Sequence, residues 1–169
     1  AKGHRVSGSV EDLKYRTELW SNETVRTGGQ GVTTLRFLDK TKLQVSNNSE
    51  VVLDRFVYDD DTDTGEMAMA FTKGAFRFIT GHMENLDGFK LRTPTVAIGI
   101  RGTDFKVRVA ADGTTTVSVL EGQVEVTPLG GGSGANIGEG QSAIGTATGV
   151  TTAQGDAVGS GMNMESNKY

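Results

Sequence analysis

The chain has 169 residues, with 17 Lys and Arg against 21 Asp and Glu, and a formal net charge of −4 at pH 7. This acidic balance argues against electrostatic binding to nucleic acid or to an anionic membrane, and no apolar run approaches the roughly 20 residues that span a bilayer. The absence of cysteine excludes disulfides, zinc–thiolate sites, iron–sulfur clusters and cysteine nucleophiles. With 24 glycines, 2 prolines and recurrent Val, Thr and Phe at alternate positions, the composition predicts one all-β domain with many tight turns.

The first half of the chain reads as a series of short strands. Apolar residues alternate with polar ones within each, and Gly, Asn or Asp stand between them, which is typical of strands joined by turns. The strands are expected at residues 6–10, 15–20, 31–37, 42–45, 51–58, 66–71 and 74–79.

The stretch from 88 to 109 is the most distinctive text in the sequence. Proline at 94 disfavours helix at Thr93, and Val96, Ile98 and Ile100 then alternate with small residues. An Arg-Gly-Thr break at 101–103 precedes a second alternation, so we expect two strands joined at a glycine corner. A hairpin is expected soon after, with strands 114–120 and 123–127 joined by a turn at Glu121-Gly122.

From residue 130 the chain becomes small and polar. Ile137, Ala143 and Ile144 are expected to supply a final strand. We therefore expect a β-domain over 1–145 and a Gly/Thr-rich tail over 146–169. A sandwich, a barrel and a stacked, solenoid-like sheet all fit the strand spacing, and the frequent small residues favour the stacked sheet.

An acidic loop is the strongest candidate for a metal site. Asp59, Asp61 and Asp63 alternate and could present oxygens to Ca²⁺, but the EF-hand spacing fails because glycine comes one place late. The alternative is a solvated hairpin loop. We therefore expect no cofactor, with calcium as the one candidate.

No catalytic constellation stands out in the sequence. His4 and His82 are the only histidines, and neither has a second ligand at metal spacing. Asn22 and Asn47 lie in N-glycosylation patterns that matter only where the source has that machinery, and surface turns are the default interpretation. We expect the chain not to be an enzyme.

Three arginines stand beside apolar residues and could form an anion site. These are Arg77, Arg92 and Arg101. In a net acidic domain the favoured alternative is that they pair with carboxylates such as Asp54 and Asp104.

The stretch at 93–105 resembles the signature of the FecR-domain family, a "TP-x-apolar-x-apolar-x-RGT-x-F" string. Further blocks occur along the chain in the family's order, four before this stretch and one after it: VRTG at 25–28, LRFLD at 35–39, TKLQVSNNSEVVL at 41–53, KGAFRF at 73–78 and LEGQVEV at 120–126. Two positions depart from the family's pattern. Gly99 stands where a branched or small residue is common, and Lys40 stands after Asp39, where the family often has glycine. The signature residues are Thr93, Pro94, Val96, Ile98, Ile100, Arg101, Gly102, Thr103, Phe105 and, in the late block, Gly122.

The resemblance implies an exported β-rich fold without catalysis. The best-known members lie in the periplasm, joined to a membrane helix and a cytoplasmic anti-sigma segment, and relay iron-transport signals. Neither attachment is evident in this sequence, which limits how far the sensor role transfers. The chain begins at Ala1, as expected after removal of a signal peptide at a small-residue site.

Two functions are open. The favoured hypothesis is an exported structural protein, extracellular or on the cell surface, that polymerises with copies of itself through its edge strands and termini. The alternative is a periplasmic ligand- or protein-binding module of the FecR sensor type. The candidate assembly residues lie near the two ends of the chain: Val6, Val10, Val150, Val158 and Tyr169.

Overall fold

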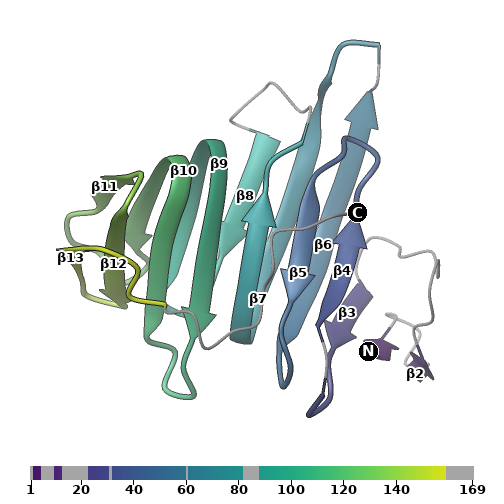
Figure 1. The fold of residues 1–169 in the computed structure, drawn as a ribbon, viewed down its shortest axis with the longest axis horizontal. Helices are drawn as coiled ribbons and strands as arrows, with labels where there is room; N and C mark the ends of the chain where they lie inside the picture. Colours follow the sequence, from purple (N-terminus) through teal and green to yellow (C-terminus); the bar gives the residue numbers. More distant parts are fainter. Residues whose placement is uncertain are drawn as a thin grey trace.

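The computed structural model describes residues 2–4, 10–12, 23–30, 32–59, 61–81 and 88–158. These residues form a 13-stranded sheet. Its strands are β1 (Lys2–His4), β2 (Val10–Asp12), β3 (Glu23–Arg26), β4 (Thr33–Arg36), β5 (Lys42–Val45), β6 (Glu50–Asp59), β7 (Thr64–Ile79), β8 (Phe89–Arg92), β9 (Val96–Val109), β10 (Thr115–Pro128), β11 (Ala135–Gly138), β12 (Gln141–Thr146) and β13 (Gly149–Gln154). The expectation of an all-β, stacked FecR-like sheet is confirmed (Figure 1).

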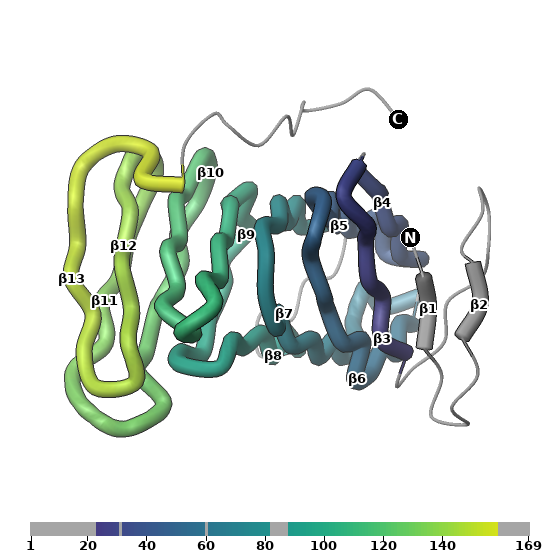
Figure 2. Tube along the Cα trace, turned by 90° about the horizontal axis from the view of Figure 1, so that it is seen from below, coloured from purple at the N-terminus to yellow at the C-terminus, as the bar shows by residue number. Residues whose placement is uncertain are grey.

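The strands follow the order β13-β12-β10-β9-β8-β7-β6-β3-β1-β2, with β11 beside β10, and β5 between β7 and β4. Neighbours are antiparallel, apart from the parallel pair β7–β8. The three long strands β7, β9 and β10 each pair with different partners along their two halves. The sheet therefore folds over on itself into two facing layers (Figure 2).

We name the layers by their strands. Layer A contains β4, β5, the second halves of β7 and β9, the first half of β10, β12 and β13. Layer B contains β1, β2, β3, β6, the first halves of β7 and β9, β8, the second half of β10, and β11.

Glycines with positive φ mark the corners at which the long strands pass between the layers. They are Gly74 (φ 97°), Gly102 (φ 49°) and Gly122 (φ 83°). The pairing of β9 with β10 shifts register on both sides of Glu121. The expected hairpin at Glu121-Gly122 is therefore wrong, as is the expected division of the chain into two strands at 101–103. A single left-handed residue bends a strand and shifts its register, and both strands continue through the corner together.

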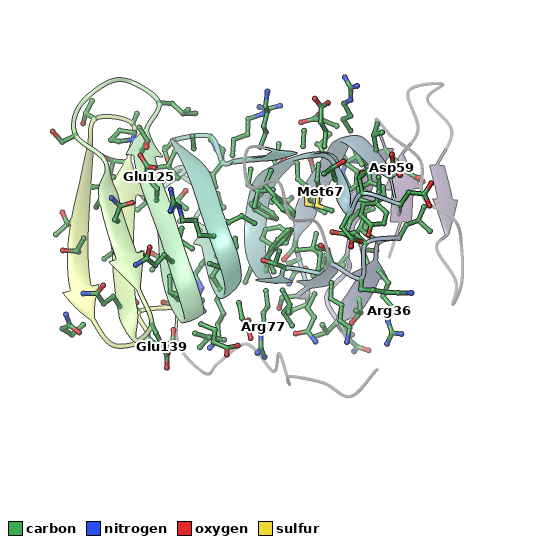
Figure 3. All side chains as sticks on the ribbon, turned by 90° about the horizontal axis from the view of Figure 1, so that it is seen from above. Arg36, Asp59, Met67, Arg77, Glu125 and Glu139 are labelled. Atoms are coloured by element: carbon green, nitrogen blue, oxygen red, sulfur yellow. The ribbon has the colours of Figure 1, made fainter. Side chains whose placement is uncertain are left out.

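The core lies between the two layers and consists of the residues that alternate along each strand. Met67 in Figure 3 points into this interior. Phe78 and Phe105 stack there with ring centroids 5.5 Å apart, and Phe71 and Phe76 with centroids 4.8 Å apart.

The predicted strands at 42–45 and 51–58 are confirmed by β5 and β6. Lys40 still forms the tight turn between β4 and β5 by adopting φ 72°, and its N–H donates to the carbonyl of Phe37 at 3.0 Å. The predicted strand at 15–20 and most of that at 6–10 lie outside the described residues. The sheet extends beyond residue 145, because β13 pairs with β12 along its whole length.

The corner at Gly122 yields a test. A Cβ added there would stand 2.3 Å from the carbonyl oxygen of Gly102, whereas one added at Gly102 meets nothing within 4 Å. Gly122→Ala should lower the free energy of unfolding by about 3 kcal/mol or more, and Gly102→Ala by about 1 kcal/mol, the cost of left-handed backbone alone. Urea denaturation measures both. Equal losses would show that the corner does not depend on this close approach.

Candidate functional site

The Thr93-Pro94 pair precedes β9, and the Thr93 side chain is part of a buried hydroxyl cluster. The Thr93 hydroxyl oxygen accepts a hydrogen bond from the Val96 N–H at 3.1 Å and lies 2.7 Å from the Thr115 hydroxyl. Thr95 donates its hydroxyl proton to the carbonyl of Gly113 at 2.7 Å. These contacts join the entrance of β9 to that of β10, so this part of the signature positions strands.

The Arg-Gly-Thr part of the signature forms the corner itself. Thr103 is buried, and its N–H donates to the Thr80 hydroxyl at 2.9 Å, while that hydroxyl donates to the Thr103 carbonyl at 2.9 Å. Phe105 is fully buried in the core, and Arg101 is exposed. These residues are close in space because β9 bends there.

A depression of about 260 Å³ lies at this corner. Its polar side chains are Thr80, Thr103, Asp104 and Glu121. The Thr80 hydroxyl is bound to the backbone of Thr103, the Thr103 hydroxyl lies 3.5 Å from that of Thr80, and Asp104 is paired with Arg77. Glu121 is the other carboxylate of this lining.

The strongest ion pair in the described residues joins β7 and β9 on the outer face of layer A. Arg77 donates from Nε and Nη2 to the two carboxylate oxygens of Asp104 at 2.9 and 2.6 Å, and the side chains are only 9% and 15% exposed. The hydrogen bond to Asp104 raises the pKa of Arg77 above its ordinary value. The guanidinium therefore stays charged at any working pH, and Figure 3 shows it pointing away from the core.

The expected pairing of arginines with carboxylates is confirmed for two of the three. Arg77 binds Asp104, and Arg92 binds Asp54 at 3.1 Å in an exposed pair. Two of the three arginines proposed for an anion site are therefore bound to carboxylates of the chain itself.

The acidic loop forms the hairpin between β6 and β7. The Tyr58 hydroxyl donates to Oδ1 of Asp63, and the N–H of Asp61 donates to Oδ1 of Asp59 at 3.0 Å. Two carboxylates are thus used to hold the turn. Within the described ranges, no group of three or more His, Cys, Asp or Glu side chains is placed to hold a metal ion. The expectation of no cofactor, with calcium at Asp59, Asp61 and Asp63 as the one candidate, stays a prediction.

Several sequence candidates lie outside the description. Nothing is described of His82, Asn22, Val6 or Tyr169, and only the backbone of His4 and Val10, in β1 and β2. Asn47 is exposed in the turn before β6, as expected of a surface turn.

The last two assembly candidates have well-defined places in the fold. Val150 lies in β13, at the edge of layer A, and is half-buried against the core. Val158 is 1% exposed and packs with Ala75, apart from the main core. Sequence reasoning missed β13 because its alternation is carried by Thr, Ala and Gly, which give little contrast in hydrophobicity.

A family model described as "FecR protein" matches residues 23–125. This is more than half of the chain. The chain belongs to the FecR family. The resemblance seen in the signature blocks is therefore confirmed, and β11, β12 and β13 lie beyond the matched residues.

Solved structures also share this fold. Two crystal structures, at 2.50 and 1.65 Å resolution, of a protein described as an anti-sigma factor from Parabacteroides distasonis each superpose with a TM-score of 0.60 at 19% identity. The match covers 79% of this chain and 60% of the neighbour's chain, so this chain spans less than two thirds of the neighbour's length. No curated protein sequence matches the chain.

These findings overturn the favoured functional hypothesis. A structural protein that self-assembles into a filament, with copies of itself as partners, is contradicted by membership of a signalling family and by the anti-sigma-factor neighbours. An extracellular location loses its support with it. The error came from treating open strand edges as polymer contacts, although an open edge accepts a strand from any source. In the described part of the chain, no helix is long and apolar enough to cross a membrane.

The Arg77–Asp104 pair predicts a difference between two matched substitutions. Asp104→Ala leaves a largely buried guanidinium without its carboxylate and should lower the free energy of unfolding by about 2 kcal/mol or more. Asp54→Ala removes the partner of Arg92, which is 59% exposed, and should cost less than about 1 kcal/mol. Urea denaturation of both variants measures the difference, and losses of equal size would contradict the assignment.

Calcium gives a second test at this site. Because the carboxylates of Asp59 and Asp63 already hold the turn, we expect no rise in Tm on adding calcium. A loop with millimolar affinity would instead gain about 1.4 kcal/mol at a tenfold excess of calcium over its Kd, which thermal unfolding followed by circular dichroism detects. A rise that disappears in Asp61→Asn would contradict this expectation.

Proposed function

We propose that this chain is a non-catalytic binding module of an exported signalling protein of the FecR type, and that its partner is another protein. Membership of the FecR family supports the signalling role and the exported location. The neighbours described as anti-sigma factors support a regulatory role, at the level of fold alone.

The single observation that carries the proposal is the open edge at β13. Sites for small ligands enclose most of the ligand, and the shallow corner depression does not offer such a cavity. Strand β13 instead presents six residues of backbone at the end of layer A. A protein partner is the natural occupant of a surface of this kind.

The register of β12 with β13 identifies the exposed backbone groups. The N–H of Gly155 donates to the carbonyl of Gly140 at 2.7 Å, so the hydrogen-bonded pairs along this hairpin alternate from there. In an antiparallel pair, the residues between those pairs direct their N–H and C=O groups outward. On β13 these are Val150, Thr152 and Gln154, and no described residue pairs with their outward groups.

This edge lacks the features that usually protect an edge strand. Proteins block open edges with lysine, proline, bulges or very short strands. Residues 140–155 contain no charged residue and no proline, and β12 and β13 pair without a bulge. The edge of layer A at the opposite end, β4, is shorter and carries Arg36. We infer that β13 is the partner-binding edge.

Thr152→Pro tests this edge with little effect on the fold. The N–H that it removes faces outward, so the pairing with β12 is retained and Tm should stay close to that of the parent protein. Thr152→Val keeps the N–H and is the matched control. In cross-linked cells of the source, the parent chain should form one discrete adduct with a protein other than itself. Thr152→Val should form the same adduct, and Thr152→Pro should not.

Two outcomes would contradict the proposal. A ladder of adducts at multiples of the mass of the protein itself would show self-association in place of a different protein partner. An adduct that persists in Thr152→Pro would show that the partner binds elsewhere than at β13.

A further inference from the structure

After β13 the chain turns back across the outer face of layer A. Residues 155–158, which we call the latch, lie over a row of side chains that are in register across four strands: Ser142, Ser118, Lys106 and Arg77. Ser142 and Ser118 are buried although they point away from the core. The latch is the described segment that contacts them there.

The two serines bind the latch through its backbone. Ser142 donates its hydroxyl proton to the carbonyl of Gly155, and its oxygen accepts the N–H of Ala157 at 3.0 Å. The Ser118 oxygen accepts the N–H of Val158 at 3.1 Å. The two hydroxyls lie 2.8 Å apart, and because the Ser142 proton is already used, Ser118 must donate to Ser142. Both hydroxyls are thereby fixed in direction.

Two side chains of the latch are also bound. Lys106 donates to the carboxylate of Asp156 at 2.7 Å, and the lysine side chain is only 12% exposed. Val158 packs against Ala75, two residues before Arg77 on the same face, and is 1% exposed. This face thus binds one backbone carbonyl, one carboxylate, two backbone N–H groups and one aliphatic side chain, all from residues 155–158.

The latch is bent: Gly155 has φ 92°, and the Val158 N–H also donates to Oδ1 of Asp156 at 3.1 Å. We propose that Ser142, Ser118, Lys106 and Ala75 form a binding groove for a bent peptide of the pattern acidic–small–aliphatic, and that the latch occupies this groove in cis. The serines recognise the backbone groups that the bend brings together. Lys106 and Ala75 select the acidic and aliphatic side chains. This groove is separate from the edge of β13, and the inference does not depend on a partner there.

The size of the contacts indicates that the latch can be displaced. Each hydrogen bond contributes about 1 kcal/mol net, and a partly exposed ion pair contributes less than that. A tethered segment competes at an effective concentration in the millimolar range, so a free peptide of the same pattern reaches the groove only when the latch is weakened or the peptide is in excess.

The test uses a fluorescently labelled synthetic peptide with the sequence of residues 154–159, QGDAVG, blocked at both ends. Asp156→Ala combined with Val158→Ser weakens the latch without changing the groove. The peptide should bind this double variant at least about tenfold more tightly than the parent protein, because the cis occupant no longer competes. Fluorescence anisotropy measures both affinities.

Two controls give the groove its signature. Adding Lys106→Met to the double variant should weaken binding of the peptide about fivefold, and a peptide with Asn in place of Asp should bind the double variant more weakly by a similar factor. If the folded double variant does not bind the peptide, or binds it equally well with Lys106→Met, the proposal is wrong and the latch only closes the fold.

A second measurement needs no substitution. A millimolar excess of the unlabelled peptide added to the ¹⁵N-labelled parent protein should shift the amide resonances of Ala157 and Val158 as the latch leaves. The Asn peptide should shift them less at the same concentration. Resonances that do not respond to either peptide would overturn the proposal even if the double variant fails to fold.

Discussion

The structure depends on one constraint, the left-handed backbone at the glycine corners. At Gly102, β9 passes from layer B to layer A, and at Gly122 the paired strand β10 passes from layer A to layer B. At Gly74, β7 passes from layer B to layer A. The close approach of Gly122 to the carbonyl of Gly102 is possible only without a side chain. Because the strands bend in step, one continuous sheet can enclose its own core, and the signature residues around 93–105 serve this geometry.

Part of this fold was predictable from the sequence, and the missing parts have physical reasons. Alternation of apolar residues located β5 and β6 and gave the all-β class. It could not distinguish a reversing turn at Glu121-Gly122 from a corner, since glycine with positive φ serves both, and only the partner strand decides. The pairing of Arg77 with Asp104 followed from the chemistry of a net acidic domain, although 27 residues separate the two side chains.

The functional surfaces were harder to predict. Apart from Gln154 and Asp156, strand β13 and the latch consist of Thr, Ala, Gly and Val, residues that carry no chemical signature in a sequence. Val158 was noticed only as a candidate for contacts with other copies of the chain, whereas in the structure it packs on Ala75 of its own chain. Their contacts are made by backbone groups and by Ser118 and Ser142, which are neighbours only because β10 and β12 pair in this register. The sequence alone does not show that register. Both proposed surfaces lie on layer A close to β12.

The central claim is that β13 is an open edge able to accept a strand, and amide hydrogen exchange measured by NMR tests it most directly. In the isolated protein, the amides of Val150, Thr152 and Gln154 should exchange at close to the unprotected rate. Those of Thr151 and Ala153, whose N–H groups are directed at β12, should be protected. Protection of all five amides would show that the edge is already paired and would contradict the account.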